Sequence, residues 1–515
     1  MFIKKIKLEL ILLVLIVVFS AFLRLNDLNN LPPGLYTDEV SIGLNAYLLT
    51  TTGRDEFNIP HPLWFRSYGD YKLPVYIYSV AASMLAFGKN DFAVRLPSAL
   101  AGIGSVVVMY FLLRTLLSLS VVKGRDWLRH LPILGALLMA VSSWAIQFSR
   151  GGFEVNEGIF FFYLGIWLYL LFIKKEKVYY LLSAFILFVV SMYTYHTFRL
   201  NVPVLFIVLS IFSFFKFPKH RVLLIVSLVI SFILFLPLLQ FSLSPFGQNR
   251  FSATSAFSEY PVSSVFQALV LYPLVFLKDY LSFFSFDFLF SGGDGIGRHQ
   301  VPGFGEMYRW QLPFLIAGII FLVKEKRSYL KYVTFFLLLL SPFAASFARP
   351  SPHALRSLPM VVPYLILISI GILGVYNIVK KNVKIKIGFI LIVTSVAIYE
   401  FLLLEHFYYV HYPNVNVLDW GAGYKQIVQA VEPIKSKYKV IYVDDKLSYA
   451  KTYFAFYDPT IKIEMVSASW SASKQSAPVL YIRPYYGPSN NPLIIKNVYL
   501  PTINHDIVAQ LWEIK

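Results

Sequence analysis

The stretch Leu8–Leu23, LELILLVLIVVFSAFL, decides the fold class of this chain. It is apolar along almost its whole length and follows the basic N-terminus Met1-Phe2-Ile3-Lys4-Lys5-Ile6-Lys7. A signal peptide would end in a small-residue cleavage site, and we find none after this stretch. We therefore interpret it as an uncleaved first transmembrane helix.

The composition extends this interpretation to the rest of the chain. Of the 515 residues, 57% are hydrophobic and only 14% are charged, whereas about 25% of the residues in a soluble domain are charged. This balance excludes a soluble enzyme, and it excludes a disordered chain because disorder requires low hydrophobicity. The absence of cysteine excludes disulfides, zinc–thiolate sites, iron–sulfur clusters and thiol nucleophiles.

Apolar segments of span length recur along the chain and predict a mainly α-helical, polytopic membrane bundle of about eleven spans. Besides the first, we place them near residues 96–117, 131–148, 157–173, 178–196, 198–215, 221–241, 310–323, 329–347, 357–379 and 387–405.

The basic residues predict the orientation of these spans. The net charge is +18, and a cytoplasmic N-terminus places the basic links on the cytoplasmic side, as the positive-inside rule requires. A nucleic-acid surface would need one clustered basic patch instead, so no nucleic-acid partner is expected. The basic links contain Lys4, Lys5 and Lys7; Lys123, Arg125 and Arg129; Lys174, Lys175 and Lys177; Lys216, Lys219 and Arg221; Lys324, Lys326, Arg327 and Lys331; and Lys380, Lys381, Lys384 and Lys386.

Three parts then face away from the cytoplasm. Two are loops within a transmembrane module of residues 1–405, at about 25–95 and 242–309. This topology requires the apolar stretch 73–87 to be an interfacial or re-entrant helix, and it leaves an amphipathic stretch near 262–290 in the second loop. The third part, residues 406–515, alternates strand-like and helix-like segments and predicts a small extracytoplasmic α/β domain. Its strand-like runs are 439–443, 461–466 and 478–482, and its helix-like run is 449–457.

Two pairs of acids stand at the outer ends of helices. Asp38 and Glu39 follow a Pro-Pro-Gly turn, where a helix is expected to start with Thr37 or Asp38 as its N-cap. Acids at a helix N-terminus also simply complement the dipole, so a structural role is equally open for this pair. Glu154 and Glu157 follow the third span in a very short loop. Carboxylates beside hydrocarbon are costly and usually functional or paired.

Several cations lie near these acids in the predicted topology. His353 and Arg356, three residues apart, would share a helical face, and arginine presents a fork suited to phosphate oxygens. Contact with lipid headgroups is the alternative for this pair. Arg150 could close its loop by pairing with Glu154, and Lys72 could pair with Asp70 or Glu39. The glycine-rich segment 291–306 lacks the Gly-Lys-Ser/Thr of a P-loop, and the chain has neither a Gly-x-Ser-x-Gly elbow nor a His-Glu-x-x-His motif.

In order and sidedness, these motifs resemble those of bacterial glycosyltransferases of the GT-C fold class that use dolichyl- or polyprenyl-phosphate sugars. This group includes protein O-mannosyltransferases and lipid A aminoarabinose transferases. The resemblance rests on Thr37-Asp38-Glu39, Gly69-Asp70-Tyr71-Lys72-Leu73-Pro74, Val94-Arg95-Leu96-Pro97-Ser98-Ala99-Leu100, Ser149-Arg150 with Glu154 and Glu157, and Pro352-His353-Ala354-Leu355-Arg356-Ser357.

The resemblance implies an integral membrane enzyme that moves a sugar from a polyprenyl-phosphate donor to an extracytoplasmic protein, glycan or lipid, with inversion. Asp38 would be the catalytic base or acceptor-orienting group with Glu39 in support, and Glu154 and Glu157 are the candidates for the second-loop acid. Some members of this group use a divalent metal ion and others use none, so a metal ion is an open expectation. The donor phosphate would be bound by Arg150, Lys72, His353 and Arg356.

Other classes of function predict other patterns. A lipid-carrier flippase would show inverted repeats and charges near the bilayer midplane, which we do not find. A surface polysaccharide polymerase or ligase is not excluded by the layout of the acids. A non-catalytic scaffold would not need carboxylates at the membrane face. The expected location is the plasma or inner membrane, with the active site and the C-terminal domain outside the cytoplasm.

Overall fold

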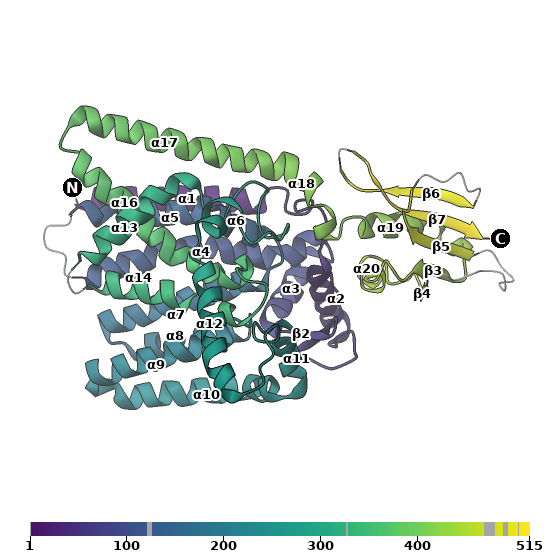
Figure 1. The fold of residues 1–515 in the computed structure, drawn as a ribbon, viewed down its shortest axis with the longest axis horizontal. Coiled ribbons are helices and arrows are strands. Elements are labelled where there is room, and N and C mark those ends of the chain that lie inside the picture. Colours follow the sequence, from purple (N-terminus) through teal and green to yellow (C-terminus); the bar gives the residue numbers. More distant parts are fainter. Residues whose placement is uncertain are drawn as a thin grey trace. The chain divides into compact units, whose positions relative to one another are not determined.

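The computed structural model describes residues 2–120, 126–325, 328–467, 479–487, 493–502 and 504–514 (Figure 1). It divides into two compact units. The first contains Met1–Asn26, Leu63–Tyr76 and Arg95–Glu405, and the second contains Asp27–Pro62, Ile77–Val94 and His406–Lys515. Some residues named above lie outside the described ranges: Lys123, Arg125, Lys326 and Arg327 of the basic links, and Pro478 of a predicted strand.

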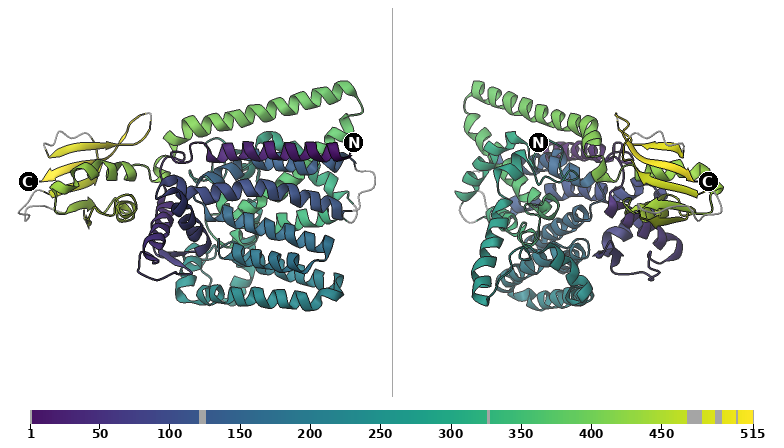
Figure 2. Two further views of the ribbon diagram at one scale, coloured as in Figure 1. Left: turned by 180° about the vertical axis from the view of Figure 1, so that it is seen from behind. Right: turned by 45° about the vertical axis from the view of Figure 1, so that its right-hand side comes forward.

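A bundle of helices and one short hairpin form the first unit. Figure 2 shows its long helices running side by side. The helices are α1 (Phe2–Leu25), α5 (Leu131–Val141), α6 (Ser143–Arg150), α7 (Glu154–Lys175), α8 (Val178–Met192), α9 (Phe198–Lys216), α10 (Arg221–Leu243), α11 (Pro245–Thr254), α12 (Val265–Ser282), α13 (Leu312–Val323), α14 (Tyr329–Leu340), α15 (Ala354–Ser357), α16 (Val361–Val379) and α17 (Val383–His406), with most of α4 (Asp91–Leu119) and the start of α3 (Pro74–Phe87). The hairpin pairs β1 (Phe65–Ser67) with β2 (Asp70–Lys72).

Nine helices of the described ranges are long and apolar enough to cross a membrane. The count rises to ten if the bent pair 126–141 and 143–150 forms one span. The expectation of a mainly α-helical, multi-pass membrane protein is therefore confirmed. The nine are Leu8–Leu25, Asp91–Leu119, Glu154–Lys175, Phe198–Lys216, Pro218–Leu243, Val265–Ser291, Tyr329–Phe347, Ala354–Val379 and Val383–Val415.

Individual spans differ from the sequence-based expectation. The predicted span 131–148 is bent by 52°, because Ser142 is extended and its hydroxyl caps the next helix by accepting the Ala145 N–H. Predicted spans 178–196 and 310–323 are apolar helices of fewer than 18 residues. Conversely, the stretch near 262–290, expected as an amphipathic part of an outer loop, contains a candidate span at Val265–Ser291. The sidedness of the loops therefore stays a prediction.

Side-chain distribution in the first unit fits a lipid environment. Large apolar residues on α1, α10 and α17 are exposed, including Leu15, Ile233 and Leu391, whereas α16 is buried along most of its length. Glycines let α13 and α16 approach closely, since a Cβ at Gly318 would lie 1.9 Å from the Leu367 carbonyl oxygen. Small residues at such a contact are typical of helix pairs in membranes.

The second unit combines helices with a five-stranded mixed sheet. Its strand order is β4-β3-β5-β7-β6, with β3 parallel to both neighbours and β7 antiparallel to β5 and β6. The strands are β3 (Ile441–Asp444), β4 (Ile463–Val466), β5 (Val479–Pro484), β6 (Ile494–Tyr499) and β7 (Ile507–Ile514), and the helices are α2 (Thr37–Thr52), α18 (Tyr412–Val415), α19 (Tyr424–Val431) and α20 (Ala450–Tyr457), with most of α3 and the start of α4.

Parts of the first predicted loop belong to this same unit. Asp91, at the start of α4, lies 2.8 Å from the ammonium of Lys425 on α19 and accepts a hydrogen bond from the Tyr457 hydroxyl of α20. Phe456 of α20 also packs against α2, where a Cβ at Gly43 would meet its ring. Residues 27–62 and 77–94 therefore pack in one compact unit with the C-terminal sheet. The sequence did not predict this packing, because these segments are more than 300 residues apart from the sheet in the chain.

Candidate functional site

The first acid pair occupies the N-terminus of α2, in the second unit. Glu39 is fully buried, and its Oε2 accepts the backbone N–H of Tyr36 at 3.0 Å. Tyr36 is thus the N-cap, in place of the expected Thr37 or Asp38, because the Glu39 side chain reaches back to the residue before the helix. Asp38 stands in the same first turn and is half-buried. Glu39 therefore stabilises the helix start on which Asp38 is carried.

The C-terminal region supports the loop before Asp38. The Tyr453 hydroxyl of α20 donates a hydrogen bond to the Leu35 carbonyl at 2.6 Å, and the ring of Tyr36 meets the buried Trp420 edge to face at 5.6 Å. The backbone of Gly421 lies so close that a Cβ there would come 2.7 Å from the same Leu35 oxygen. Within the second unit, residues 420–453 therefore fix the segment that leads into Asp38.

The second acid pair begins α7, in the first unit. Glu154 Oε1 lies 3.9 Å from the ammonium of Lys72, and both side chains are largely buried, with exposures of 12% and 9%. Lys72 ends the hairpin strand β2, where it pairs with Phe65 of β1. Glu157, one turn further along α7, is also buried. The hairpin thus places a cation against the helix start that carries both acids.

Arg150, expected at the donor phosphate, has main-chain partners. It is fully buried at the end of α6 and donates to the carbonyls of Leu23 and Asn26, each at 2.7 Å. Arg24 has a matching role, since it donates to the carbonyls of Met139 and Ala140 at the end of α5. Guanidinium groups at the C-terminal ends of helices satisfy carbonyls that lack helical partners. These contacts tie the end of α6 to the end of α1, and binding of the donor phosphate by Arg150 stays a prediction.

A cavity of about 610 Å³ lies where α9 begins and α10 ends. Its lining includes two arginines, Arg199 and Arg356, and a histidine, His196, which can also carry positive charge. Apolar side chains such as those of Leu239 and Phe347 line it as well. The Arg199 guanidinium donates to the Ser242 hydroxyl at 3.3 Å, and Arg356 donates to the Arg349 carbonyl at 2.8 Å. Arg199 and His196 were not predicted from the sequence, although an arginine at the outer end of a predicted span was a usable signal.

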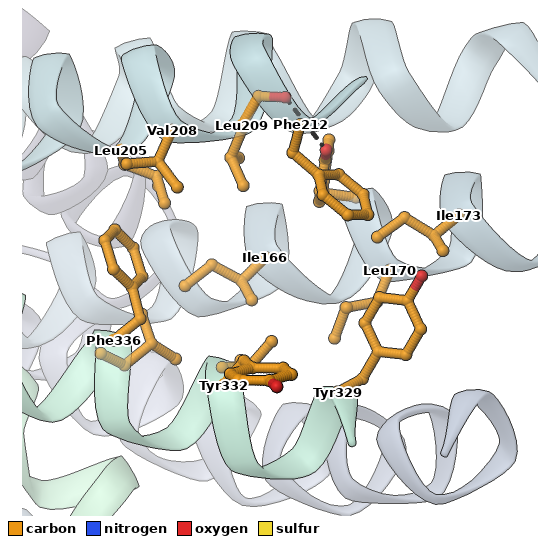
Figure 3. A pocket seen from close by; sticks show the side chains of 13 residues that line it. Ile166, Leu170, Ile173, Leu205, Val208, Leu209, Phe212, Tyr329, Tyr332 and Phe336 are labelled. Atoms are coloured by element: carbon orange, nitrogen blue, oxygen red, sulfur yellow. Dashed lines mark hydrogen bonds between the residues drawn. The ribbon is translucent and has the colours of Figure 1, made fainter. Parts of the chain in front are cut away.

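A second, apolar cavity of about 420 Å³ lies further along the same helix, where α9 faces α7 and α14 (Figure 3). Aliphatic and aromatic side chains point into it, including Leu205, Phe212, Ile166 and Phe336. Tyr169, on its wall, donates to the Leu209 carbonyl at 3.2 Å. One helix, α9, therefore lines a cationic cavity at its start and an apolar cavity along its middle.

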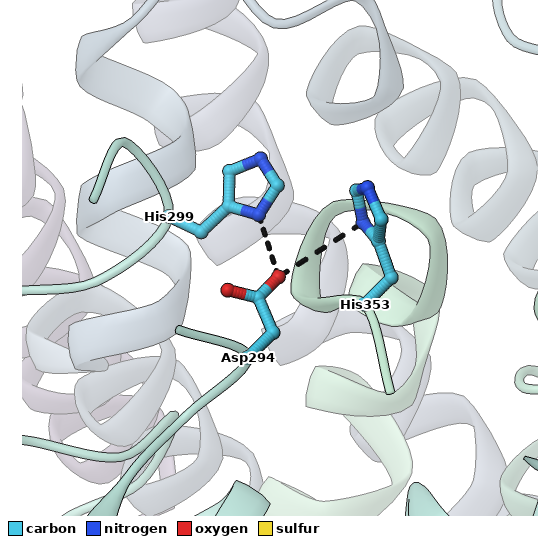
Figure 4. A group of neighbouring side chains, drawn as sticks. All are labelled: Asp294, His299 and His353. Atoms are coloured by element: carbon cyan, nitrogen blue, oxygen red, sulfur yellow. Dashed lines mark hydrogen bonds and ion pairs between the residues drawn. The ribbon is translucent and has the colours of Figure 1, made fainter. Parts of the chain in front are cut away.

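His353 and Arg356 do not share a helical face as expected. The helix α15 has only four residues and His353 is its N-cap. Arg356 lines the cationic cavity, whereas the His353 ring lies 4.8 Å from that of His299 and its Nδ1 lies 4.0 Å from Asp294 Oδ2 (Figure 4). Asp294 and His299 come from the glycine-rich segment of the second predicted loop, and the sequence did not indicate that they meet His353.

The loop that carries Asp294 and His299 also holds a buried acid, Glu306. Burial raises the pKa of Glu306 well above its usual value, and the nearby Asp294 carboxylate raises it further. The same loop packs along α6, because Ser143 at the start of this helix donates to the Glu306 carbonyl at 2.8 Å. Toward the other end of α6, the His299 ring lies 5.3 Å from that of Phe148 and 6.1 Å from that of Phe153, which precedes α7. This loop therefore borders the start of α7, which carries Glu154.

The predicted site residues are divided between the two units. Asp38 and Glu39 belong to the second unit, and the remaining six belong to the first. Within the first unit, Lys72 meets Glu154, Arg356 joins Arg199 at the cavity, and His353 joins Asp294 and His299. That the two acid pairs act on one substrate stays a prediction.

The fold is similar to that of solved GT-C glycosyltransferases. The crystal structure of ArnT from Cupriavidus metallidurans bound to undecaprenyl phosphate is similar over 98% of this chain and 97% of ArnT, with 12% identity and a TM-score of 0.55. The Archaeoglobus fulgidus oligosaccharyltransferase in its apo form matches 89% of this chain and 64% of its own, with 13% identity and a TM-score of 0.54.

Sequence comparisons are more limited. "Putative mannosyltransferase YkcB" of Bacillus subtilis (strain 168) is 32% identical over 114 residues. That match covers 22% of this chain and only 14% of YkcB. No family model matches the chain.

Proposed function

We propose that this chain is an integral membrane glycosyltransferase that transfers a sugar from a polyprenyl-phosphate carrier to an extracytoplasmic protein, glycan or lipid, with inversion at the sugar carbon. The observation that carries the proposal is the cavity lined by Arg199, Arg356 and His196 beside the apolar groups of α9 and α10. A cavity lined by cationic and apolar side chains, with a second, apolar cavity further along the same helix, suits an amphiphilic phosphate. The GT-C fold and the undecaprenyl phosphate bound to ArnT support this choice of ligand.

The donor would lie along α9. Its phosphate oxygens would accept hydrogen bonds from the guanidinium groups of Arg199 and Arg356, which are strong because both partners are charged. Leu205 follows Arg199 by six residues, or about 9 Å along a helix that rises 1.5 Å per residue. A prenyl chain leaving the cationic cavity could therefore reach the apolar cavity that Leu205 lines.

The chemistry assigned to the acids is an in-line displacement. The Asp38 carboxylate accepts the proton of the acceptor hydroxyl, and the hydroxyl oxygen forms a bond to the anomeric carbon. The bond between that carbon and the phosphate oxygen breaks, and the lipid phosphate leaves as an anion stabilised by Arg356 and Arg199. Glu39 holds the start of α2, and Glu154 with Lys72 sets the charge at the start of α7. A resident metal ion is not needed to balance this step.

The test is transfer by the purified full-length protein in vesicles. A panel of polyprenyl-phosphate sugars is supplied, and mass spectrometry follows the released polyprenyl phosphate. Arg356→Gln should weaken donor binding by about 10- to 100-fold, because it removes a charge-assisted hydrogen bond of roughly 1.5–3 kcal/mol. Arg221→Gln is the matched control, since Arg221 is an exposed arginine at the opposite end of α10.

Two results would contradict the proposal. One is the absence of released lipid phosphate with every donor in the panel. The other is equal donor binding by Arg356→Gln and Arg221→Gln, which would leave Arg356 as a contact for bulk lipid headgroups. Transfer of an oligosaccharide from a lipid diphosphate, but not of single sugars, would instead identify a polymerase or ligase.

A further inference from the structure

Three side chains from two distant segments of the first unit converge near α15 (Figure 4). Asp294 and His299 lie in the loop after α12, and His353 precedes α15. Asp294 Oδ2 lies 2.6 Å from His299 Nδ1 and 4.0 Å from His353 Nδ1. One potential ligand atom of each residue lies within 4.8 Å of those of the other two. The fold thus brings the imidazole of His353 to a carboxylate and a second imidazole that lie more than fifty residues earlier in the chain.

The donor set and its surroundings fit a transition-metal ion. Zinc binds imidazole nitrogen and carboxylate oxygen at about 2.0–2.2 Å in tetrahedral sites, so its ligand atoms lie about 3.3 Å apart. The observed 2.6 Å and 4.0 Å bracket that spacing. The side chains are almost fully buried, with exposures of 0% for Asp294 and 4% for His299. Mixed nitrogen and oxygen donors favour zinc or a similar ion over magnesium or calcium, which prefer oxygen alone.

A neighbouring acid offers an independent indication. Glu306 is buried in the same loop and interacts electrostatically with Asp294. Its Oε1 has no hydrogen-bond partner among the residues that the structure describes. A buried carboxylate oxygen without a partner is costly unless a ligand or ion satisfies it.

We propose that Asp294, His299 and His353 bind one divalent transition-metal ion, with a water molecule in the fourth position. The ion cross-links the loop after α12 to the segment that leads into α15. The Asp294 carboxylate also accepts the Ala354 N–H at 2.8 Å. Hydrogen bonds of this kind orient the side chains that bind a metal ion.

The site has a structural consequence for two neighbouring segments, the start of α7 and the helix α15 that carries Arg356. Its loop contacts the α6–α7 junction through Phe148 and Phe153, and Trp144 of α6 donates to the Ala354 carbonyl at 3.2 Å. Arg356 follows His353 by three residues. If the proposed function holds, the ion is a positioning element for Arg356 and for the start of α7. Metal binding itself does not depend on that function.

The experiment measures metal content and stability of the full-length protein in detergent. Protein expressed with added zinc and purified without chelator is analysed by inductively coupled plasma mass spectrometry. We expect about one equivalent of metal per chain for the unmodified protein, and less than a tenth of that for His299→Ala, because each ligand contributes strongly to affinity. His220→Ala is the matched control, since His220 also pairs with a carboxylate, Glu176, at 3.3 Å but belongs to no group of three potential metal ligands among the described residues.

A second readout keeps the proposal testable if His299→Ala folds poorly. Cobalt added to the chelator-treated, unmodified protein should give the visible absorption of a four- or five-coordinate site with nitrogen ligands. The chelator should also lower the Tm of the unmodified protein and of His220→Ala, but not that of Asp294→Asn.

The proposal is overturned if the unmodified protein binds no zinc or cobalt, or if Asp294→Asn and His299→Ala retain a full equivalent. The cluster would then be a hydrogen-bonded Asp–His pair beside a second histidine. Because none of these measurements needs a sugar donor, failure here is distinct from failure of the proposed transfer reaction.

Discussion

The two acid pairs both stand in the first turn of a helix, yet their partners differ. In α2, the partner is the main chain, because Glu39 accepts the Tyr36 N–H and is fully buried. In α7, the partner is a side chain, because Glu154 lies beside Lys72 of the hairpin. The same sequence signal, acids at a helix start, thus corresponds to a backbone cap in one unit and a buried ion pair in the other.

This difference assigns the acids to different tasks. Glu39 is fully buried and caps the helix, whereas Asp38 in the same turn is half-buried, so we assign Glu39 to holding the helix and Asp38 to the chemistry. Glu154, largely buried beside Lys72, is assigned to setting the charge at the start of α7. Substitutions that separate these tasks test the comparison directly.

The largest effect is expected for the acid that has the chemical task. Asp38→Asn removes the proton acceptor while keeping nearly the same shape, and general-base catalysis typically contributes about 10²- to 10⁴-fold. Transfer by Asp38→Asn should fall by at least ~100-fold, with donor binding unchanged. Steady-state release of lipid phosphate and direct donor binding are the measurements.

Glu39→Gln is the matched variant for this comparison. It keeps a side-chain oxygen that can accept the Tyr36 N–H, so the helix start should persist and the rate should fall far less than in Asp38→Asn. The reverse order of the two variants would show that Glu39 has the chemical task.

An intermediate effect is expected at the ion pair of α7. Lys72→Met leaves the largely buried Glu154 without its lysine, and Glu154→Gln leaves the lysine without its carboxylate. Each single variant should lower the Tm, whereas the double variant should recover part of the loss, because removing both charges leaves neither unpaired. The coupling free energy should be about 1–3 kcal/mol. Thermal unfolding of the four proteins in one detergent gives this double-mutant cycle.

Strictly additive losses would break the comparison at this point. They would mean that Lys72 and Glu154 contribute to stability through other neighbours and not through their ion pair.

Local patterns in the sequence predicted much of the fold. Apolar runs located the long helices α1, α4 and α7, and alternation near 461–466 located β4 at Ile463–Val466. These features depend on neighbours in sequence, which is why they could be read without a structure. The break at Ser142 and the shortness of α15 depend on capping and packing, which a hydropathy pattern does not record.

The site was predictable only in part, because some of its contacts depend on packing between distant segments and not on local sequence. The acids at helix starts were found from their local motifs. The meeting of His353 with Asp294 and His299 depends on a fold that joins residues more than fifty positions apart. Likewise, the support of Leu35 by Tyr453 requires the first predicted loop and the C-terminal region to fold together. A sequence without aligned relatives carries no signal for such long-range contacts.

The smallest effect is expected from loss of the hydrogen bond by which Tyr453 supports Leu35. Tyr453→Phe removes the hydrogen bond to the Leu35 carbonyl, three residues before Asp38, but keeps the ring stacked on Tyr424 at 4.2 Å. The loss should be about 1 kcal/mol in stability, with a fall of a few-fold in the rate and no change in donor KM, because the base is displaced rather than removed.

Tyr457→Phe, on the same helix, is the control that makes this measurement specific. It removes a comparable hydrogen bond, to Asp91 at 3.1 Å, away from the Leu35 loop. Both variants should therefore lower the Tm by similar amounts, while only Tyr453→Phe slows transfer. Equal rates for the two variants would mean that the C-terminal region stabilises the second unit but does not position Asp38.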